Sequence, residues 1–596
     1  MNEVIGSIAA LRATSKATYS DAFLTGYYVQ GDGGGGAYWY DSTDTTSGDN
    51  GGTIIVAADG GRWKLQVIDA ISVKQFGAKG DGAADDTAAI QAALNSAGVN
   101  STVKFPPGTY LLSATLNALA NQSLLGSGPN STILRRFSDY GDTLKFAEAY
   151  ACSVKGIWFN HGTMHVATDT SLNNLVRSPS AHVRLQQAQG VVIEDCWMWR
   201  MPYQVAIDQG SLIKIHRCNM QGTWDGEYAA AQEGIASVLV GGVGYTQIVA
   251  IEHCYFGGSG SGPRNVTYTS SDKGETTTNI IQDSGNQFAV LINQCEDFLI
   301  SNSYMGGNWN SCIYSNPVSG SVNLDWRITG NFIDGAGATG ALIYFSSQAN
   351  GTFVTGVTIA NNVFNGEQQT FQGVVTYNPH GTKPVITDFT ITGNCFQAIV
   401  GSVFMFYNAQ GGVVSGNSIT GYNSLNASAG GDLTFSCAAF ISENPRNIIF
   451  IGNLLGGAVN TASSPSNAYR GFYYGGADGS IIEKNTLIVG GGLSGTQVGR
   501  VDANVVVVTA PGNYQLLGNE DIVVINKTVG SVTQILQQSN IPIGFKVTIK
   551  DGKGDVATNP IQFGGTVDGS LNPIYTTPYV SKTLVWNGTQ WNVVAS

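Results

Sequence analysis

The chain has 596 residues, of which 12% are charged and 78 are glycine, and its formal net charge is −12. So few charged residues and so many glycines exclude long charged surface helices and favour turn-rich β structure. The acidic balance argues against nucleic acid as a partner, because a phosphate backbone is bound chiefly through Lys and Arg.

The opening segment, MNEVIGSIAALRATSKATYS, carries neither a basic leader nor an apolar core of about 7 to 15 residues, and no apolar run approaches about 18 residues. We therefore expect a protein made in the cytoplasm without a signal peptide and without membrane insertion. Eight cysteines are too few for a disulfide scaffold, and none forms a CxxC pair. We expect buried thiols, no metal site and no cofactor.

A glycine-rich loop precedes a predicted helix in the stretch FGAKGDGAADDTAAIQAAL, residues 76–94. It lacks the Lys-Ser/Thr pair of a phosphate-binding loop, and no βαβ unit follows it. Asp85 or Asp86 is expected to cap the helix. One apolar stripe runs along this helix, formed by Ile90, Ala93, Leu94 and Ala97. We predict that the helix covers the open end of a solenoid, whose core and strand edges would otherwise be exposed.

A short pattern recurs ten times downstream: an aliphatic or aromatic residue, two variable residues, a small polar anchor, any residue and a bulky apolar residue. The anchors are Cys196, Cys218, Cys254, Ser303, Asn331, Asn362, Asn394, Asn417, Asn453 and Asn485. Their spacing varies from 22 to 49 residues, which suits the coils of a solenoid with variable loops. Equivalent residues of stacked parallel coils lie about 4.8 Å apart, so the Asn amides are expected to form a hydrogen-bonded ladder.

Six residues before each anchor lies a second column, in which eight of ten residues are Gly, Asp or Asn and the exceptions are Leu212 and Ile248. This composition predicts a turn. Asp297 and Asp325 belong to this column, so we interpret them as structural despite their appearance as a carboxylate pair. The predicted architecture is an all-β parallel β-helix.

Three segments resemble known families. Residues 71–94, with VKFPPGTYLL (103–112) and LLGSGPNSTIL (124–134), resemble the start of pectate-lyase-like β-helix proteins. Residues 24–41 and 51–65 resemble the neck that precedes the β-helix of bacteriophage tailspikes. Residues 544–563 and 583–596 resemble the small β domain that ends many phage tail fibres and spikes.

The resemblance implies a right-handed β-helix and four parts in tailspike order. They are an N-terminal neck (1–68), an entry and capping segment (69–100), a β-helix (101–500) and a C-terminal β domain (501–596) for trimerisation or carbohydrate binding. It also implies a homotrimer in the virion, attached through its N-terminal end to a phage tail or baseplate protein. Such a protein acts at the host surface on a bacterial capsular or O-antigen polysaccharide.

Charged residues precede the first three anchors as the pairs Glu194-Asp195, His216-Arg217 and Glu252-His253. Glycosidic hydrolysis usually needs two carboxylates, about 6.5 to 9.5 Å apart in inverting enzymes. Glu194 and Glu252 should lie two coils apart, roughly 9 to 10 Å between backbones. They are candidate catalytic residues, with His216, Arg217 and His253 as candidate substrate contacts. The alternative is a salt-bridge ladder or a trimer contact.

A second candidate site is the insertion GTWDGEYAAAQEG, residues 222–234. Asp225 and Glu227 are candidate catalytic acids there, beside Trp224, on which a pyranose face can stack. The alternative is a solvated loop. Among outward aromatic residues, Trp199 and Trp309 are candidate substrate contacts, and Trp197 and Tyr304 can line the same groove, whereas Met198 and Met305 are predicted to lie in the core.

Three functions fit these patterns. The first is an endo-acting glycoside hydrolase with paired carboxylates. The second is a polysaccharide lyase, for which His216, Arg217 and His253 offer basic groups. The third is an adhesin that binds glycan without cleaving it, because β-helices also do this.

Overall fold

A computed structural model of the chain describes residues 2–137, 141–161, 180–223, 235–257, 264–269, 276–281, 287–366, 372–399, 401–420, 437–442, 446–456, 470–475, 481–484, 487–489, 498–500, 505–509, 513–516, 521–526, 533–537, 541 and 543–595. The chain divides into two compact units. Unit 1 comprises Met1–Lys484 and Ile488–Val498, and unit 2 comprises Asn485–Leu487 and Gly499–Ser596.

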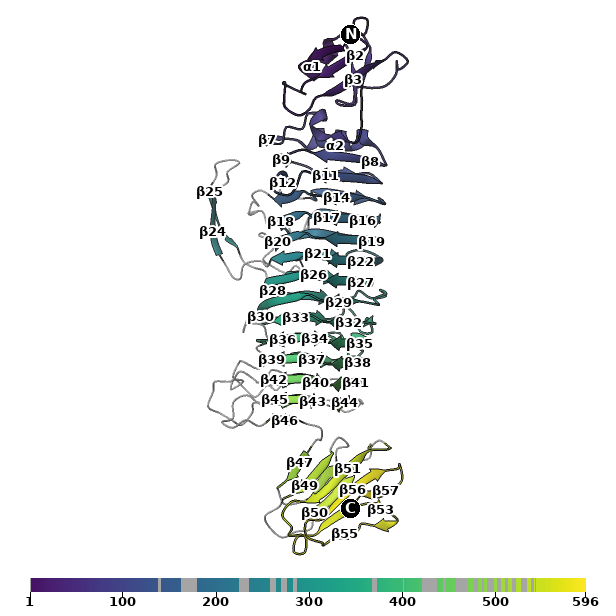
Figure 1. Cartoon of the computed structure of the whole chain (residues 1–596), viewed down its shortest axis with the longest axis vertical. Helices are drawn as coiled ribbons and strands as arrows, with labels where there is room; N and C mark the ends of the chain where they lie inside the picture. Colours follow the sequence, from purple (N-terminus) through teal and green to yellow (C-terminus); the bar gives the residue numbers. More distant parts are fainter. Residues whose placement is uncertain are drawn as a thin grey trace. The chain divides into compact units, whose positions relative to one another are not determined.

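Unit 1 begins with a small β domain built on a five-stranded sheet (Figure 1). Its elements are β1 (Asn2–Ile5), α1 (Ile8–Ala13), β2 (Asp21–Leu24), β3 (Gly36–Asp41), β4 (Ile54–Val56) and β5 (Arg62–Leu65). The strand order is β1-β2-β3-β5-β4, and the strands bury a core around Leu24, Tyr38 and Trp63. Alternation of buried and exposed residues along β2 and β5 leaves the other face of the sheet in solvent.

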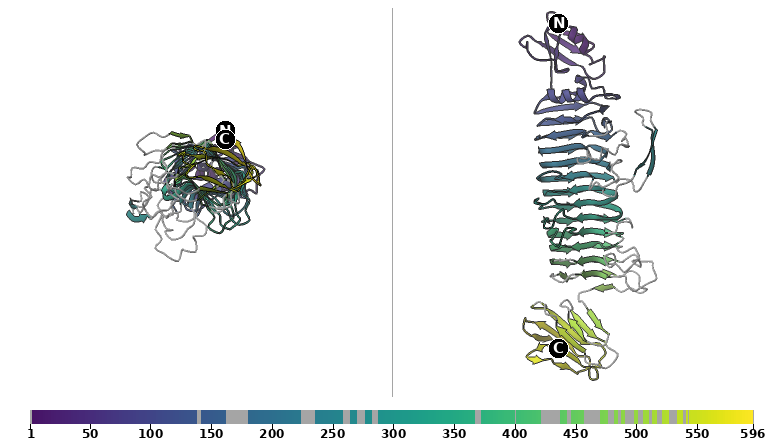
Figure 2. Two further views of the ribbon diagram at one scale, coloured as in Figure 1. Left: turned by 90° about the horizontal axis from the view of Figure 1, so that it is seen from below. Right: turned by 180° about the vertical axis from the view of Figure 1, so that it is seen from behind.

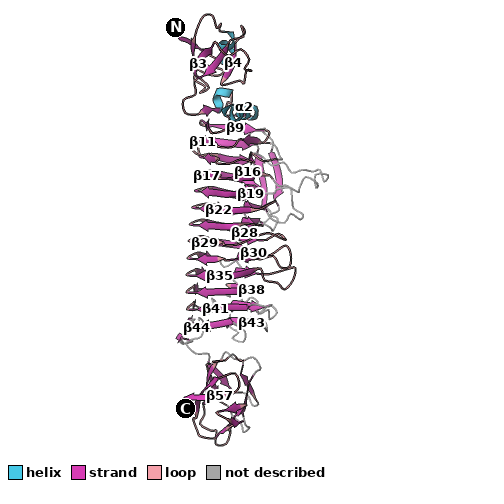
Figure 3. Cartoon of the chain, turned by 90° about the vertical axis from the view of Figure 1, so that its right-hand side faces the viewer, coloured by secondary structure: helices cyan, strands magenta, loops and turns pink. Residues whose placement is uncertain are grey.

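The glycine loop and its helix form the start of the β-helix, in the order β6 (Ile71–Ser72), η1 (Val73–Phe76), β7 (Asp81–Asp85) and α2 (Thr87–Ala97). Among the described residues, Figure 3 shows helix in the N-terminal β domain and at this start of the β-helix. Ile90, Ala93 and Leu94 are fully buried and pack in one cluster with the first coil, as the apolar stripe predicts.

The backbone of the glycine loop binds a carboxylate of the chain itself. The N–H groups of Lys79 and Gly80 donate to the two oxygens of Asp86 at 2.6 and 3.0 Å. Burial raises the pKa of Asp86 despite these bonds. Asp85 makes the bond at the helix start, accepting from the Thr87 N–H at 3.0 Å. The loop therefore anchors the capping helix.

Within the described residues, thirty-nine strands form one continuous, mostly parallel sheet that coils through three faces (Figures 1 and 2), which confirms the predicted parallel β-helix. The first face consists of β8 (Ser101–Phe105), β11 (Gln122–Gly126), β14 (Ser153–Lys155), β17 (Val192–Glu194), the second half of β19 (Tyr203–His216), β22 (Thr246–Glu252), β27 (Glu296–Ser301), β29 (Arg327–Thr329), β31 (Val354–Thr355), β32 (Thr358–Ala360), β35 (Ile386–Thr392), β38 (Ala409–Ser415), β41 (Arg446–Ile451) and β44 (Ile481–Lys484).

The second face follows directly after the anchors. It consists of β9 (Gly108–Leu112), β12 (Thr132–Arg136), β15 (Trp158–His161), β18 (Trp197–Met201), β20 (Asn219–Thr223), β23 (Tyr255–Gly257), the first parts of β28 (Tyr304–Ser315) and β30 (Phe332–Phe345), β33 (Val363–Asn365), β36 (Cys395–Gln397), β39 (Ser418–Thr420), β42 (Leu454–Gly456) and β45 (Leu487–Val489).

The third face closes each coil. It consists of β10 (Leu116–Ala118), β13 (Leu144–Ala147), β16 (Ala181–Gln189), the first half of β19, β21 (Ile235–Val240), β26 (Gln287–Ile292), the last parts of β28 and β30, β34 (Gln372–Thr376), β37 (Phe404–Tyr407), β40 (Cys437–Ser442) and β43 (Arg470–Gly475), and β46 (Val498–Arg500) ends the sheet. A separate antiparallel hairpin, β24 (Arg264–Thr269) and β25 (Thr276–Ile281), stands beside the coils in Figures 1 and 2.

The predicted amide ladder is present inside the coils. Asn331, Asn362, Asn394 and Asn417 each donate through Nδ2 to the Oδ1 of the next anchor, at 2.9 to 3.0 Å, ending at Asn453. Each Oδ1 also accepts the backbone N–H of the preceding anchor. Asn485 lies outside the described residues.

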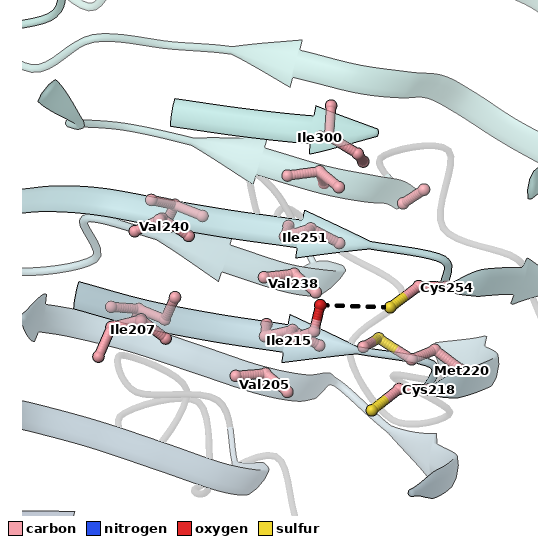
Figure 4. Close-up of a cluster of buried hydrophobic side chains, with 14 of the residues drawn as sticks. Val205, Ile207, Ile215, Cys218, Met220, Val238, Val240, Ile251, Cys254 and Ile300 are labelled. Atoms are coloured by element: carbon pink, nitrogen blue, oxygen red, sulfur yellow. Dashed lines mark hydrogen bonds between the residues drawn. The ribbon is translucent and has the colours of Figure 1, made fainter. Parts of the chain in front are cut away.

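Thiols fill the anchor position of earlier coils. Cys196, Cys218 and Cys254 are buried, and Cys254 contacts the Ile215 carbonyl at 3.7 Å (Figure 4). Stacked aliphatic side chains such as Val205, Val238 and Ile251 surround them. Met198 and Met305 are fully buried, as predicted.

The predicted turn column joins the third face to the first and has a left-handed backbone in every described coil. Its residues are Gly190, Leu212, Ile248, Asp297, Asp325, Gly356, Asp388, Gly411 and Asn447, with φ between 52° and 71°. Gly, Asp and Asn adopt this conformation most readily. Asp297 and Asp325 thus hold turns, which agrees with the structural interpretation.

Unit 2 is a β domain of two sheets. The larger has the order β47-β49-β51-β56-β57-β53-β54 and the smaller β48-β50-β52-β55. The strands are β47 (Val505–Val508), β48 (Tyr514–Leu516), β49 (Ile522–Ile525), β50 (Thr533–Gln537), β51 (Lys546–Asp551), β52 (Ile561–Gly564), β53 (Thr566–Val567), β54 (Ser570–Leu571), β55 (Ile574–Tyr575), β56 (Ser581–Trp586) and β57 (Trp591–Ala595). Trp591 and Phe563 pack in its core. Across the described part of both units, no helix is long and apolar enough to span a membrane.

Candidate functional site

The charged residues before the first anchors form one corner between the first and second faces, here called the charged corner. Glu194 pairs in register with His216, and His216 pairs with Glu252. The next position of each coil is the turn itself, where Asp195, Arg217 and His253 have φ of 53°, 50° and 54°. Six charged or titratable residues therefore lie on three consecutive coils, as the spacing predicts.

Cations neutralise every carboxylate of the charged corner. Lys155 Nζ lies 2.9 Å from Glu194 Oε2, and Lys214 Nζ lies 2.8 Å from Glu252 Oε2. Arg217 bridges the first two acids, with contacts of 2.6 Å to Glu194 and 2.7 Å to Asp195.

Histidines sit beside these pairs. His216 Nδ1 lies 3.4 Å from Glu194 Oε1, and the rings of His216 and His253 meet edge to face at 5.3 Å. The corner thus alternates acids and bases from coil to coil, on an outer surface of the β-helix.

These ion pairs set the protonation of the corner. Lys155 holds the pKa of Glu194 below its usual range, Arg217 does the same for Asp195, and Lys214 for Glu252. A general acid that must protonate a leaving group needs a raised pKa. Ionised Glu194 and Glu252 are therefore equipped to act as a base or as members of an ion-pair ladder.

The second predicted acid pair, Asp225 and Glu227, lies outside the described residues together with Trp224. Trp309 lies on β28, where its backbone pairs with Ala336. Trp199 lies on β18 and is half-buried.

Aromatic side chains gather on the outer surface of the second face. This aromatic strip consists of Trp158, Trp197, Trp199, Tyr255, Tyr304 and Phe332. The Trp158 ring meets Trp199 edge to face at 4.7 Å. Tyr255 stacks on Tyr304 at 4.9 Å, and Tyr304 stacks on Phe332 at 5.6 Å. Tyr255 is 43% exposed and Phe332 is 38% exposed, so the strip is open to solvent.

Polar side chains accompany the strip two residues further along each strand. Asp334 accepts a hydrogen bond from the Tyr304 hydroxyl at 2.9 Å and another from the Asn365 amide at 2.8 Å. In an earlier coil, Gln221 donates to Asn219 at 3.0 Å. Long insertions of the chain follow strands of this same face, after β15, β20, β23, β39 and β42.

Sequence reasoning identified Trp197, Trp199 and Tyr304 but missed Trp158, Tyr255, Phe332 and Asp334. A signal for two of them was present, because Tyr255 and Phe332 come directly after an anchor, like Trp197. The position after an anchor starts the second face, so aromatic residues there lie in one column.

A buried ionic cluster on the outer side of the third face was also missed. Arg184 lies between two carboxylates, 2.8 Å from Asp142 and 2.8 Å from Asp208. Burial lowers and the two carboxylates raise the pKa of Arg184, with a net shift upward. Nearby, His182 contacts Thr143 Oγ1 at 3.2 Å and the Trp199 carbonyl at 2.7 Å. Burial lowers the pKa of His182 to about 3, so it is neutral.

The described residues hold no cluster of three or more His, Cys, Asp or Glu side chains that is arranged to bind a metal ion.

Two family models match the chain. Residues 4–69 match the phage tail protein small four-stranded beta-sheet domain, and residues 70–314 match rhamnogalacturonase A/epimerase, pectate lyase-like. The first match covers the N-terminal β domain and the second covers the β-helix from its capping helix through the charged corner.

Curated relatives match short segments. The preneck appendage protein of Bacillus phage PZA is 30% identical over 107 residues, which cover 17% of this chain and 12% of that protein. The probable glucan endo-1,3-beta-glucosidase of Arthroderma benhamiae is 46% identical over 56 residues, 9% of this chain and 6% of that protein. The matches span only 4 to 12% of the length of four such relatives.

Among solved structures, the gp42 tailspike of Acinetobacter phage vb_AbaP_AS12 aligns over 99% of this chain and 87% of its own, with 11% identity and a TM-score of 0.46. Residues 4–314 thus join a segment that matches a phage tail small β-sheet domain to a segment that matches a pectate-lyase-like β-helix.

Proposed function

We propose that this protein binds a bacterial capsular or O-antigen polysaccharide and depolymerises it by cleaving glycosidic bonds within the polymer. The observation that carries the proposal is the aromatic strip on the second face. Aromatic rings with adjacent amide and carboxyl groups form the kind of surface that binds sugars, since rings contact the apolar faces of a pyranose and polar groups contact its hydroxyls.

The family matches support a polysaccharide substrate. The β-helix model is named for a rhamnogalacturonase and an epimerase. Two relatives are named as a glucan endo-1,3-beta-glucosidase and a mannuronan C5-epimerase. The phage tail match at residues 4–69 favours attachment to a tail or baseplate protein through this end of the chain, in a virion that acts at the host surface.

For the chemistry we propose hydrolysis by paired carboxylates. The lowered pKa values of Glu194 and Glu252 suit the base that activates water or the nucleophile. The general acid would then be Asp225 or Glu227, on the insertion that follows β20. His216, Arg217 and His253 would hold the substrate beside these acids, together with Trp199, Trp224 and Trp309.

A lyase is the second candidate, and the contact between the rings of His216 and His253 favours it. Two adjacent imidazoles can take a proton from the carbon beside a uronate carboxylate and pass one to the leaving oxygen. Elimination would leave a double bond in the product, whereas hydrolysis leaves none.

The test uses a panel of purified capsular and O-antigen polysaccharides. Oligosaccharides released from one of them, without new ultraviolet absorbance, support hydrolysis, and new absorbance supports the lyase. Binding without any fall in polymer mass would make the protein an adhesin and contradict the depolymerase proposal.

Four single variants then assign the roles. Loss of turnover in folded Glu194→Gln or Glu252→Gln supports catalysis at the charged corner. Unchanged turnover in both variants supports the ion-pair ladder. Asp225→Asn and Glu227→Gln test the insertion in the same assay. Light scattering of the wild-type protein checks the homotrimer, and a monomeric mass would contradict it.

A further inference from the structure

The aromatic strip is interrupted at one coil. Along the column that directly follows the anchors, the order in register is Trp158, Trp197, Asn219, Tyr255, Tyr304 and Phe332. Asn219 is the one small polar residue in this run. We infer that a single sugar ring of the polysaccharide inserts at this position, edge-on between Trp197 and Tyr255 and over Asn219. This inference rests on the proposed function.

The rings beyond the gap leave no room for such insertion. Tyr255 and Tyr304 stack nearly parallel, with centroids 4.9 Å apart and planes 7° apart, and Tyr304 stacks on Phe332 in the same way. Each of these faces is already occupied by a neighbouring ring. Tyr255 therefore keeps one ring face for a ligand, and that face is directed toward the coil of Asn219.

The gap has the width of a pyranose. Strands of neighbouring coils lie about 4.8 Å apart, so the backbones of Trp197 and Tyr255 are separated by about 9.6 Å across two coils. The Trp197 ring itself stacks on Trp199, with planes 6° apart. A flat ring in contact with both sides at about 3.5 to 4 Å needs about 7 to 8 Å. A sugar ring fits, and a second stacked ring would not.

The floor of the gap offers hydrogen bonds. Asn219 and Gln221 are half-buried, and the Gln221 amide donates to Asn219 Oδ1 at 3.0 Å. This bond orients both amides, and the Nδ2 group of Asn219 is the donor that we assign to sugar hydroxyls. Gly257 borders the gap without a side chain. A Cβ at this position would lie 3.1 Å from both Gln221 Cγ and Tyr255 Cε1. The ring of Tyr255 lies over this glycine.

The position of the gap connects it to the proposed chemistry. Asn219 and Gln221 belong to β20, and β20 leads at once into the insertion with Asp225 and Glu227. Glu194 and His216 lie just before the anchors of the Trp197 and Asn219 coils. A sugar held over Asn219 would thus be placed on the coil shared by both candidate acid sets.

The test fills the gap without removing any wall. Asn219→Phe should continue the stacked column from Tyr255 and occupy the space of the sugar. Val363→Phe is the matched control, because it extends the same column beyond Phe332, away from the gap. The probe is the oligosaccharide mixture that the wild-type protein releases from the panel polysaccharide, and binding is measured by calorimetry and by tryptophan fluorescence.

We expect Asn219→Phe to weaken binding about tenfold or more, as is usual when a central contact is lost, and Val363→Phe to stay within about twofold of the wild type. A second pair of variants tests the inference in case Asn219→Phe does not fold. Tyr255→Leu should weaken binding similarly, and Tyr255→Phe, which keeps the ring, should retain most of the binding. If folded Asn219→Phe or Tyr255→Leu binds like the wild type, the inference is wrong. If wild-type protein neither binds nor degrades any panel polysaccharide, the proposed function fails first and this inference with it.

Discussion

The coils anchored by Cys196, Cys218 and Cys254 follow the same backbone path as the coils anchored by Asn331 to Asn453, but they use different side chains at equivalent positions. In the later coils, each anchor amide both donates and accepts along the axis of the β-helix. In the earlier coils, thiols contact backbone carbonyls at 3.2 to 3.7 Å. Thiols are weak donors, so these coils depend more on apolar packing.

The outer surface shows the reverse distribution. The earlier coils carry the charged corner, the tryptophans of the aromatic strip and the buried pair of carboxylates around Arg184. At the corner of later coils stand Gly330, Gly393 and Gly416 instead. The comparison indicates that uniform polar stacking stabilises the later coils, whereas the earlier coils combine a simple core with a chemically varied surface.

The largest expected effect comes from breaking the amide ladder. Asn362→Ala removes Asn362 Oδ1, which accepts from both the backbone N–H and the Nδ2 group of Asn331. It also removes Asn362 Nδ2, which donates to the Ile328 carbonyl. The Asn331 amide keeps its bond to the Ile300 carbonyl, so two buried groups lose the partner that Asn362 supplies. Each costs about 1 to 3 kcal/mol, so the loss should be roughly 2 to 6 kcal/mol. Urea unfolding measures it.

The control for this prediction is the thiol coil. Cys218→Ala deletes one sulfur whose contacts to Ile193 and His216 carbonyls are 3.6 and 3.4 Å, and should cost only about 1 to 2 kcal/mol. Equal losses in the two variants would contradict the difference drawn between the two groups of coils.

An intermediate effect is expected from His182, whose pKa burial lowers to about 3. Below pH about 6.5, His182 takes up a proton in the unfolded chain but stays neutral in the folded protein. The free energy of unfolding therefore falls by about 1.4 kcal/mol for each unit by which the pH is lowered. When the pH is lowered from 7 to 5, the free energy of unfolding of His182→Gln should therefore fall by about 2 kcal/mol less than that of the wild type. Thermal unfolding at several pH values measures this, and the exposed His380→Gln serves as control. If the free energy of unfolding depends on pH in the same way for the wild type and His182→Gln, His182 does not cause the loss of stability at low pH.

The smallest effect concerns the turn column, where the earlier coils place Leu212 and Ile248 in a left-handed backbone at φ 57° and 53°. This conformation costs an L-residue about 1 to 2 kcal/mol, and β-branched residues are the least suited to it. Ile248 is 41% exposed, so little burial is lost on substitution. Ile248→Asn should stabilise the protein by about 1 kcal/mol, and Leu212→Asn by less, as read from thermal unfolding. A loss of stability would indicate that the Ile248 side chain makes a contact in the assembled protein.

Local patterns were sufficient for the framework of the β-helix. Each of three patterns recurs at fixed positions and meets one physical requirement. The anchors stack amides, the turn column holds a left-handed turn, and the stripe of Ile90, Ala93 and Leu94 forms a buried face. For this reason the parallel β-helix and its capping helix could be predicted from sequence.

The residues around the site were predicted less completely. Glu194, His216 and Glu252 could be aligned because they precede anchors. Their partners Lys155 and Lys214 could not be aligned in this way. Lys155 lies one coil before the first repeated pattern, and Lys214 lies two positions before His216 on β19. Arg184 and Asp208, which are 24 positions apart in the sequence, come together from neighbouring coils of the third face.

The sequence by itself thus determined the repeating backbone, because each coil obeys rules that act within a few residues and between identical positions of neighbouring coils. The tertiary structure alone decided which charges neutralise one another and which rings already stack on a neighbour. These features depend on side-chain contacts between coils and on coil spacings set by variable insertions, and the order of residues along the chain specifies neither of them.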